Sequence, residues 1–193
     1  MTRLAGSQRA AGGWGIAFVV LLLVSAAMVS LPTAAQTGDR IAAFYAAHGQ
    51  VIVLQQVLGI VAVAAFIAFG LSLPPNRWLR PALWAFVVCE LATNLVPLVI
   101  VAMKPSAETA HSLTLVEDMA DSALFISVAL YVIAATLTQP TWLRVMSYVA
   151  GAACVARAVV SPFGITALDQ IAPLILVTFV LVLSIKLLVR PAR

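Results

Sequence analysis

The chain contains six long apolar segments, and each is long enough, or nearly so, to cross a lipid bilayer as a helix. A transmembrane helix needs about 20 predominantly apolar residues. Prolines and charged residues separate the segments, and proline ends a helix because it removes a backbone hydrogen bond. The predicted spans are residues 14–35, 51–73, 81–103, 113–138, 141–160 and 166–188.

The composition requires lipid as the solvent for most of this surface. The chain has 193 residues, of which 63% are hydrophobic and only 9% are charged. Soluble domains carry roughly 25% charged residues. The apolar runs are continuous, whereas strands of a transmembrane β-barrel alternate in polarity. We therefore predict an all-α fold, a single polytopic membrane domain over residues 1–193 built as a six-helix transmembrane bundle.

The basic residues predict that both termini are cytoplasmic, because cytoplasmic loops of membrane proteins are enriched in lysine and arginine. This orientation leaves only Arg40, Lys104 and Arg157 toward the outside among eleven basic residues. It makes the regions near Gly38, Ser106 and Gly164 extracytoplasmic. We expect a multi-pass protein of the inner (plasma) membrane, with four tryptophans near the cytoplasmic ends of the spans: Trp14, Trp78, Trp84 and Trp142.

Two local features concern the first two spans. The basic start and apolar run of the first span resemble a secretory signal peptide, but residues 15–31 exceed the usual 7–15 residue apolar region, so we expect a retained helix. Asp39 is the candidate N-cap of the second helix. Residues 41–50 would then extend that helix at the outer surface.

The acidic residues point to a polar site in the outer half of the membrane. Ionisable residues within spans are costly and usually face a bundle interior or a water-filled cavity. Glu90 lies near the middle of the third span and shares a helix face with Asn94. Glu117 and Asp121 share a face of the fourth span, which Asp118 widens. These four acids, Glu90, Asp121, Glu117 and Asp118, are the candidate catalytic residues.

Polar groups on other spans reach a similar depth. We predict one outward-open cavity in which Arg157 faces the acids, with Glu90 and Asn94 as its floor. The candidate substrate-binding residues are Asn94, Gln55, Gln56, Arg157, Asp169 and Tyr131. Structural alternatives stay open for most of these groups. The acids at the start of a helix could lie among lipid headgroups, and Asp169 could be an N-cap. The Arg157 side chain could extend to the membrane surface. The two glutamines could serve only to form hydrogen bonds between helices.

Several chemistries do not fit the residues present. Lys104 and Lys186 lie at helix ends, which excludes a retinal Schiff base, and His48 and His111 lie near the outer surface, which disfavours haem. The sequence has no phosphate-binding glycine loop, G-x-S-x-G or H-E-x-x-H motif. The bases form no nucleic-acid-binding stripe. We therefore predict no metal, no cofactor and no nucleic-acid partner, with membrane lipid and a lipophilic small molecule as partners.

The layout resembles uncharacterised families of small actinobacterial membrane proteins. The resemblance rests on a short basic N-terminus, a first helix, Gly38-Asp39, and residues 43–48 (Ala-Phe-Tyr-Ala-Ala-His) leading into the second helix, and it implies no activity. In type, the chain is also similar to small integral-membrane terpene cyclases, which use membrane-embedded acids. Three functions stay open: an acid–base enzyme of the cyclase or isomerase type, a proton-coupled transporter, and a non-catalytic partner subunit or lipid-binding protein. No oligomeric state is indicated.

Overall fold

A computed structural model describes residues 2–161 and 167–189 of the chain. Every helix in this part is long and apolar enough to cross a membrane, which confirms the predicted all-α, six-helix fold. The helices are α1 (Thr2–Ala26), α2 (Gly38–Ser72), α3 (Leu79–Met103), α4 (Ala107–Thr136), α5 (Thr141–Val160) and α6 (Ile171–Val189).

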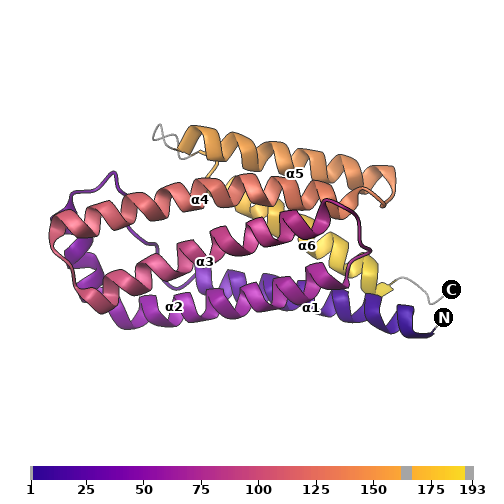
Figure 1. The fold of residues 1–193 in the computed structure, drawn as a ribbon, viewed down its shortest axis with the longest axis horizontal. Coiled ribbons are helices and arrows are strands. Elements are labelled where there is room, and N and C mark those ends of the chain that lie inside the picture. The colour runs from indigo at the N-terminus through magenta and orange to yellow at the C-terminus, as the bar shows by residue number, and fades with distance from the viewer. Residues whose placement is uncertain (1, 162–166, 190–193) are drawn as a thin grey trace.

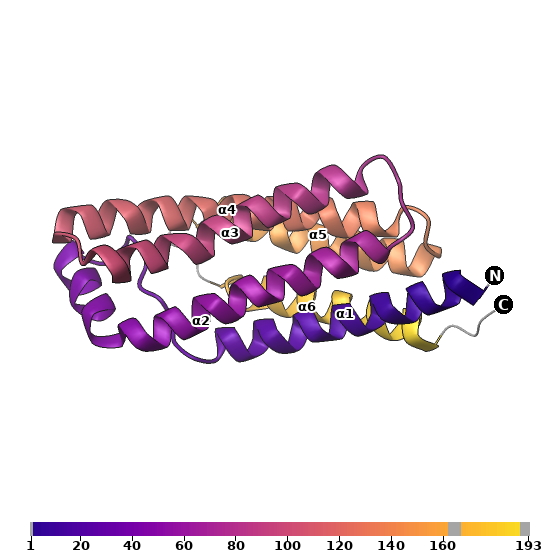
Figure 2. The ribbon, with the colours of Figure 1, turned by 60° about the horizontal axis from the view of Figure 1, so that its bottom comes forward.

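The helices form a closed ring. Each helix packs against the next one along the chain, α6 packs against α1, and α2 also contacts α4. Figures 1 and 2 show that α1 begins and α6 ends at the same end of the bundle. We call this the proximal end and the opposite one the distal end. The connections α2–α3 and α4–α5 lie at the proximal end, as an even number of crossings requires.

The first and fourth helices differ from their predicted limits. The first helix runs from Thr2 to Ala26, not from residue 14 to residue 35, and residues 27–37 form an irregular connection at the distal end. The fourth begins at Ala107 instead of residue 113, because the Ser106 side chain accepts a hydrogen bond from the Thr109 amide at 3.3 Å and caps the helix. The first turns of α4 are polar, and for that reason the predicted span did not include them.

The predicted N-cap of α2 was wrong, and α6 begins later than predicted. Thr37 holds the N-cap position of α2, while Asp39 lies in the first turn, where the helix dipole favours a carboxylate. The sixth helix begins at Ile171. Its predicted start at residue 166 lies outside the described residues. Asp169 belongs to the turn before the helix. Pro173 therefore falls in the first turn of α6, where its missing amide costs no helical bond.

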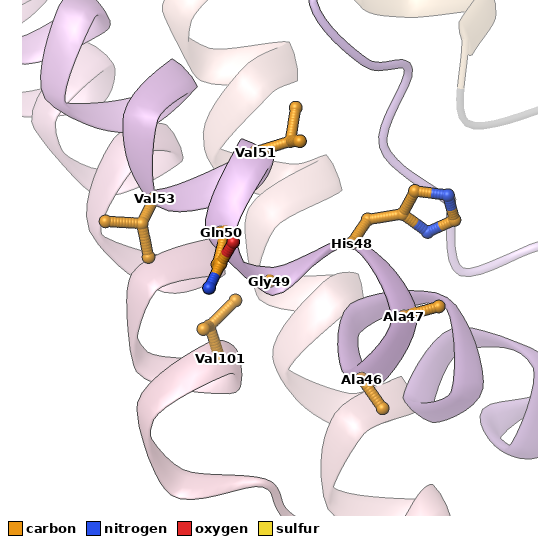
Figure 3. A pocket seen from close by; sticks show the side chains of 8 residues that line it. All are labelled: Ala46, Ala47, His48, Gly49, Gln50, Val51, Val53 and Val101. Atoms are coloured by element: carbon orange, nitrogen blue, oxygen red, sulfur yellow. The ribbon is translucent and has the colours of Figure 1, made fainter.

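The helix α2 bends close to its start. Residues 41–50 are helical, as expected, but Figure 2 shows this part of α2 turning across the distal end of the bundle. Figure 3 places the bend at Gly49. Glycine lacks the Cβ that stiffens a helix, and it is a common cause of helix bending.

Buried apolar side chains form two separate cores. The proximal core joins all six helices and contains tilted and edge-to-face aromatic rings, including Phe18, Phe66 and Phe86. The smaller distal core lies under the bent start of α2 and contains Ile41, Tyr45, Ile52, Ile100 and Ala110. The polar residues of interest lie between these two cores along the helices.

The orientation of the bundle can be tested by cysteine labelling. In a background carrying Cys89→Ala and Cys154→Ala, we expect Ala35→Cys to react with a membrane-impermeant maleimide in intact cells. Pro75→Cys should react only after permeabilisation, because the distribution of basic residues predicts a cytoplasmic proximal end. Both positions are exposed in connections between helices. Labelling of position 75 from outside would reverse the orientation.

Candidate functional site

A layer of polar side chains separates the two cores. We call it the polar layer. Its members come from α1 to α5 and from the turn before α6: Ser25, Gln55, Gln56, Glu90, Asn94, Thr114, Glu117, Asp118, Asp121, Arg157 and Asp169. On α4, residues 114, 117 and 121 follow a spacing of three and four, which places them on one helix face with Ala110 of the distal core.

Arg157 is the centre of this layer. Its guanidinium pairs with Asp121 of α4, and its Nε donates to Asp169 Oδ1 at 3.2 Å. The same guanidinium lies 4.0 Å from the centre of the Phe125 ring. The side chain is 11% exposed, so it does not extend to the surface. Arg157 therefore faces acids from two other elements of the bundle, and Asp169 is an ion-pair partner, not a helix cap.

The Glu90 side chain lies deeper, beside Asn94. The Asn94 amide donates to the Glu90 carbonyl at 2.7 Å and approaches Glu90 Oε1 at 3.4 Å. Asn94 also packs directly on the α2 backbone, since a Cβ added to Gly59 would lie 2.0 Å from Asn94 Oδ1. Asp121 is within electrostatic range of Glu90 and of Glu117. The three carboxyl groups therefore interact across α3 and α4.

Three buried oxygen atoms near Glu117 have no hydrogen-bond partner among the described residues. They are Glu117 Oε2, Thr114 Oγ1 and the Tyr45 hydroxyl. Tyr45 is only 3% exposed, and Glu117 and Asp118 lie within electrostatic range of its hydroxyl. Sequence reasoning placed Tyr45 on an outer extension of α2 and did not select Thr114. The apolar spacing of residues 41, 45 and 52 was a signal that Tyr45 faces inward.

The connection of residues 27–37 covers part of the layer. Ala34 donates its amide to Asp118 Oδ2 at 2.9 Å, and its carbonyl lies 3.0 Å from His111 Nε2. Gln55 Nε2 donates to the Val29 carbonyl at 2.9 Å, and Ser25 Oγ donates to the Gln55 carbonyl at 3.0 Å. Asp118 and Gln55 therefore hold the connection in place. The connection therefore lies over the polar layer, where the sequence predicted an outward-open cavity.

The remaining predicted site residues lie elsewhere or lack a specific contact. Gln56 is buried. Tyr131 lies in the proximal core, where its ring centre is 4.6 Å from that of Phe66, and its hydroxyl has no hydrogen-bond partner among the described residues. A pocket at the bend of α2 contains none of the predicted site residues. Within residues 2–161 and 167–189, no group of three or more His, Cys, Asp or Glu side chains is arranged to hold a metal ion.

The ion pairs predict a strong effect of removing Arg157. Arg157→Gln should destabilise the protein by about 3–5 kcal/mol, because two partly buried carboxylates lose their cation. The double variant Arg157→Gln/Asp121→Asn should recover part of this loss. Thermal unfolding in detergent micelles measures both. Equal stability of the Arg157→Gln variant and the wild type would contradict the role of the ion pairs.

The close packing of α2 on α3 gives a second prediction. Gly59→Ala should cost about 1–3 kcal/mol, because the new Cβ overlaps Asn94. Asn94→Ala should relieve this overlap, so the double variant should be more stable than the sum of the two changes predicts. Denaturation of the four variants in one detergent tests this coupling, and strict additivity would contradict the contact.

Comparisons of this chain with protein-family models, curated proteins and solved structures found no match. The chemistry of the polar layer therefore has to be derived from its own side chains. Those side chains offer several carboxyl groups, one guanidinium and unpartnered hydroxyl groups between two apolar cores.

Proposed function

We propose that the polar layer performs acid–base chemistry on a lipophilic small molecule, as an integral enzyme of the isomerase or cyclase type in the inner (plasma) membrane. The observation that carries this proposal is the charge balance of the layer. Five carboxyl groups accompany one arginine, and within the described residues Glu90 and Glu117 form no ion pair. One guanidinium cannot neutralise five carboxylates, so the layer has the capacity to bind and release protons.

The two kinds of carboxyl group suit two chemical roles. An arginine partner favours the ionised form of a carboxyl group, whereas an apolar environment without a cation favours the protonated form. Asp121, held by Arg157, is suited to accept a proton as the general base. Glu90 and Glu117 are suited to donate one as general acids. Pairs of acids with such different environments are a recurring arrangement in acid–base enzymes.

The position of the layer indicates the kind of substrate. Apolar cores lie on both sides of it, and lipid surrounds the bundle, so a substrate reaching the layer from the bilayer has to be lipophilic. Proton donation to a carbon–carbon double bond or an epoxide, followed by proton removal by Asp121, would isomerise or cyclise such a molecule without a cofactor. The unpartnered Tyr45 and Thr114 hydroxyls are available to orient a polar group on it.

A purely structural role for Glu90 explains less. An ionised carboxylate at mid-span costs at least about 2.5–3.5 kcal/mol on insertion scales. Glutamine would supply similar hydrogen bonds without this cost. A glutamate at this depth is therefore better explained by a proton that it exchanges.

A proton-coupled transporter is the second candidate, and one observation favours it. Arg157 joins α4, α5 and the turn before α6, so breaking its ion pairs would separate three elements of the ring on the distal side. A transporter that alternates access needs such a reversible closure. Protonation of Asp121 would weaken the pair with Arg157 and couple opening to proton binding.

Isotope exchange tests the enzyme on a mixture of candidate substrates. Purified protein in vesicles is incubated in D2O with a lipid extract of the source cells, and lipophilic compounds are compared by mass spectrometry. We expect protein-dependent deuterium uptake at carbon, or a new isomer. Glu90→Gln should reduce the rate by about 100-fold or more, the usual size of general acid catalysis. Asp121→Asn should also reduce it and change its pH dependence.

Glu108→Gln is the matched control, because Glu108 is an exposed acid in the first turn of α4, outside the layer. This variant should keep full exchange activity. If no exchange occurs, but the protein acidifies vesicles loaded with a pH-sensitive dye and Glu90→Gln abolishes that flux, the protein is a transporter. If neither process occurs, the accessory-subunit alternative replaces both.

A further inference from the structure

The bend of α2 forms a pocket that the proposed function does not use. It has a volume of about 630 Å³. Val101 of α3 and seven residues of α2 line it (Figure 3). The α2 residues are Ala46, Ala47, His48, Gly49, Gln50, Val51 and Val53. This volume falls within the roughly 300–1,000 Å³ typical of small-molecule sites. Figure 3 shows the Gln50 side chain pointing toward Val101.

The pocket lies at the expected depth of the lipid headgroups. From Gln50 to Ser72, α2 is roughly 34 Å long at 1.5 Å per residue, which slightly exceeds the hydrocarbon thickness of about 30 Å. The bend at Gly49 therefore coincides with the distal boundary of the hydrocarbon. Val101 lies two residues before the end of α3, at the same boundary.

The pocket continues into the lipid-facing surface of the bundle. Val53, Val57 and Val61 follow Gln50 along one face of α2, and they are 39%, 46% and 47% exposed. Val99 and Met103 of α3 are exposed as well. An acyl chain that enters the pocket can therefore extend along this apolar stripe toward the middle of the membrane.

A basic residue at the end of α3, close in the chain to the pocket residue Val101, favours an anionic group. Lys104 follows Val101 by three residues, about one helical turn further toward the distal end. It is exposed and forms no ion pair within the described part of the chain. No acidic residue lines the pocket. Lys104 is also one of the few basic residues that the positive-inside rule leaves outside, and a lipid phosphate would explain its position.

We propose that this pocket binds one phospholipid of the outer leaflet. Its phosphate pairs with Lys104, the Gln50 amide donates to an ester carbonyl, and one acyl chain lies along Val53, Val57 and Val61. Gly49 keeps the space open, because a Cβ at this position would lie 3.2 Å from Val101 Cγ1. This site does not depend on the acid–base function.

Native mass spectrometry tests the site directly. Protein reconstituted in vesicles of phosphatidylethanolamine and phosphatidylglycerol is extracted into mild detergent, and the phospholipids retained per chain are counted. The wild type should retain one phospholipid through delipidation. Ala46→Trp, which fills the pocket, should lose it. Ala43→Trp is the matched control on the same segment, exposed but outside the pocket, and should retain the lipid.

Lys104→Gln should weaken retention about fivefold, the loss expected for one basic residue near an anionic lipid surface. Thermal unfolding of each variant shows that it is folded, so that loss of lipid is not loss of structure. Equal retention by the Ala46→Trp and Ala43→Trp variants, whether high or low, would overturn the proposal, because the bound lipid would then be unspecific.

Discussion

The contact of Arg157 with Asp121 and Asp169 holds the distal half of the bundle together. It fixes α5 against α4 and keeps the turn before α6 in place. A guanidinium at this depth is tolerable only because two carboxylates and the face of Phe125 surround it. The same acids would repel each other without the cation. The arrangement of three elements therefore depends on one charged side chain.

The polar layer exists because lipid cannot solvate polar groups on the outside of the bundle. Side chains that carry hydrogen-bonding groups turn inward, and the bundle gathers them between its two apolar cores. Within this layer, close packing depends on a glycine where Asn94 lies directly on Gly59. The unpartnered oxygens of Tyr45, Thr114 and Glu117 show that the described residues alone do not satisfy this layer. A substrate or water would complete it.

The distal end combines two different coverings. The irregular connection 27–37 is tied to the polar layer through Ala34 and Val29, so it limits access from the aqueous side. The bent start of α2 instead lies across another part of the same end. The two proposed sites, the polar layer and the pocket at the bend of α2, therefore lie under different coverings.

The six helices follow from the amino-acid sequence alone, because apolar length and proline positions are local properties of each segment. The similar depth of Arg157 and the acids also follows from it, since depth depends on residue number along a helix. Which groups meet depends instead on the tertiary structure. The rotation of each helix and the path of residues 27–37 paired Arg157 with Asp121 and Asp169, used Asp118 to hold a loop, and brought Tyr45 inward. Those outcomes arise from packing between helices, which no single segment encodes.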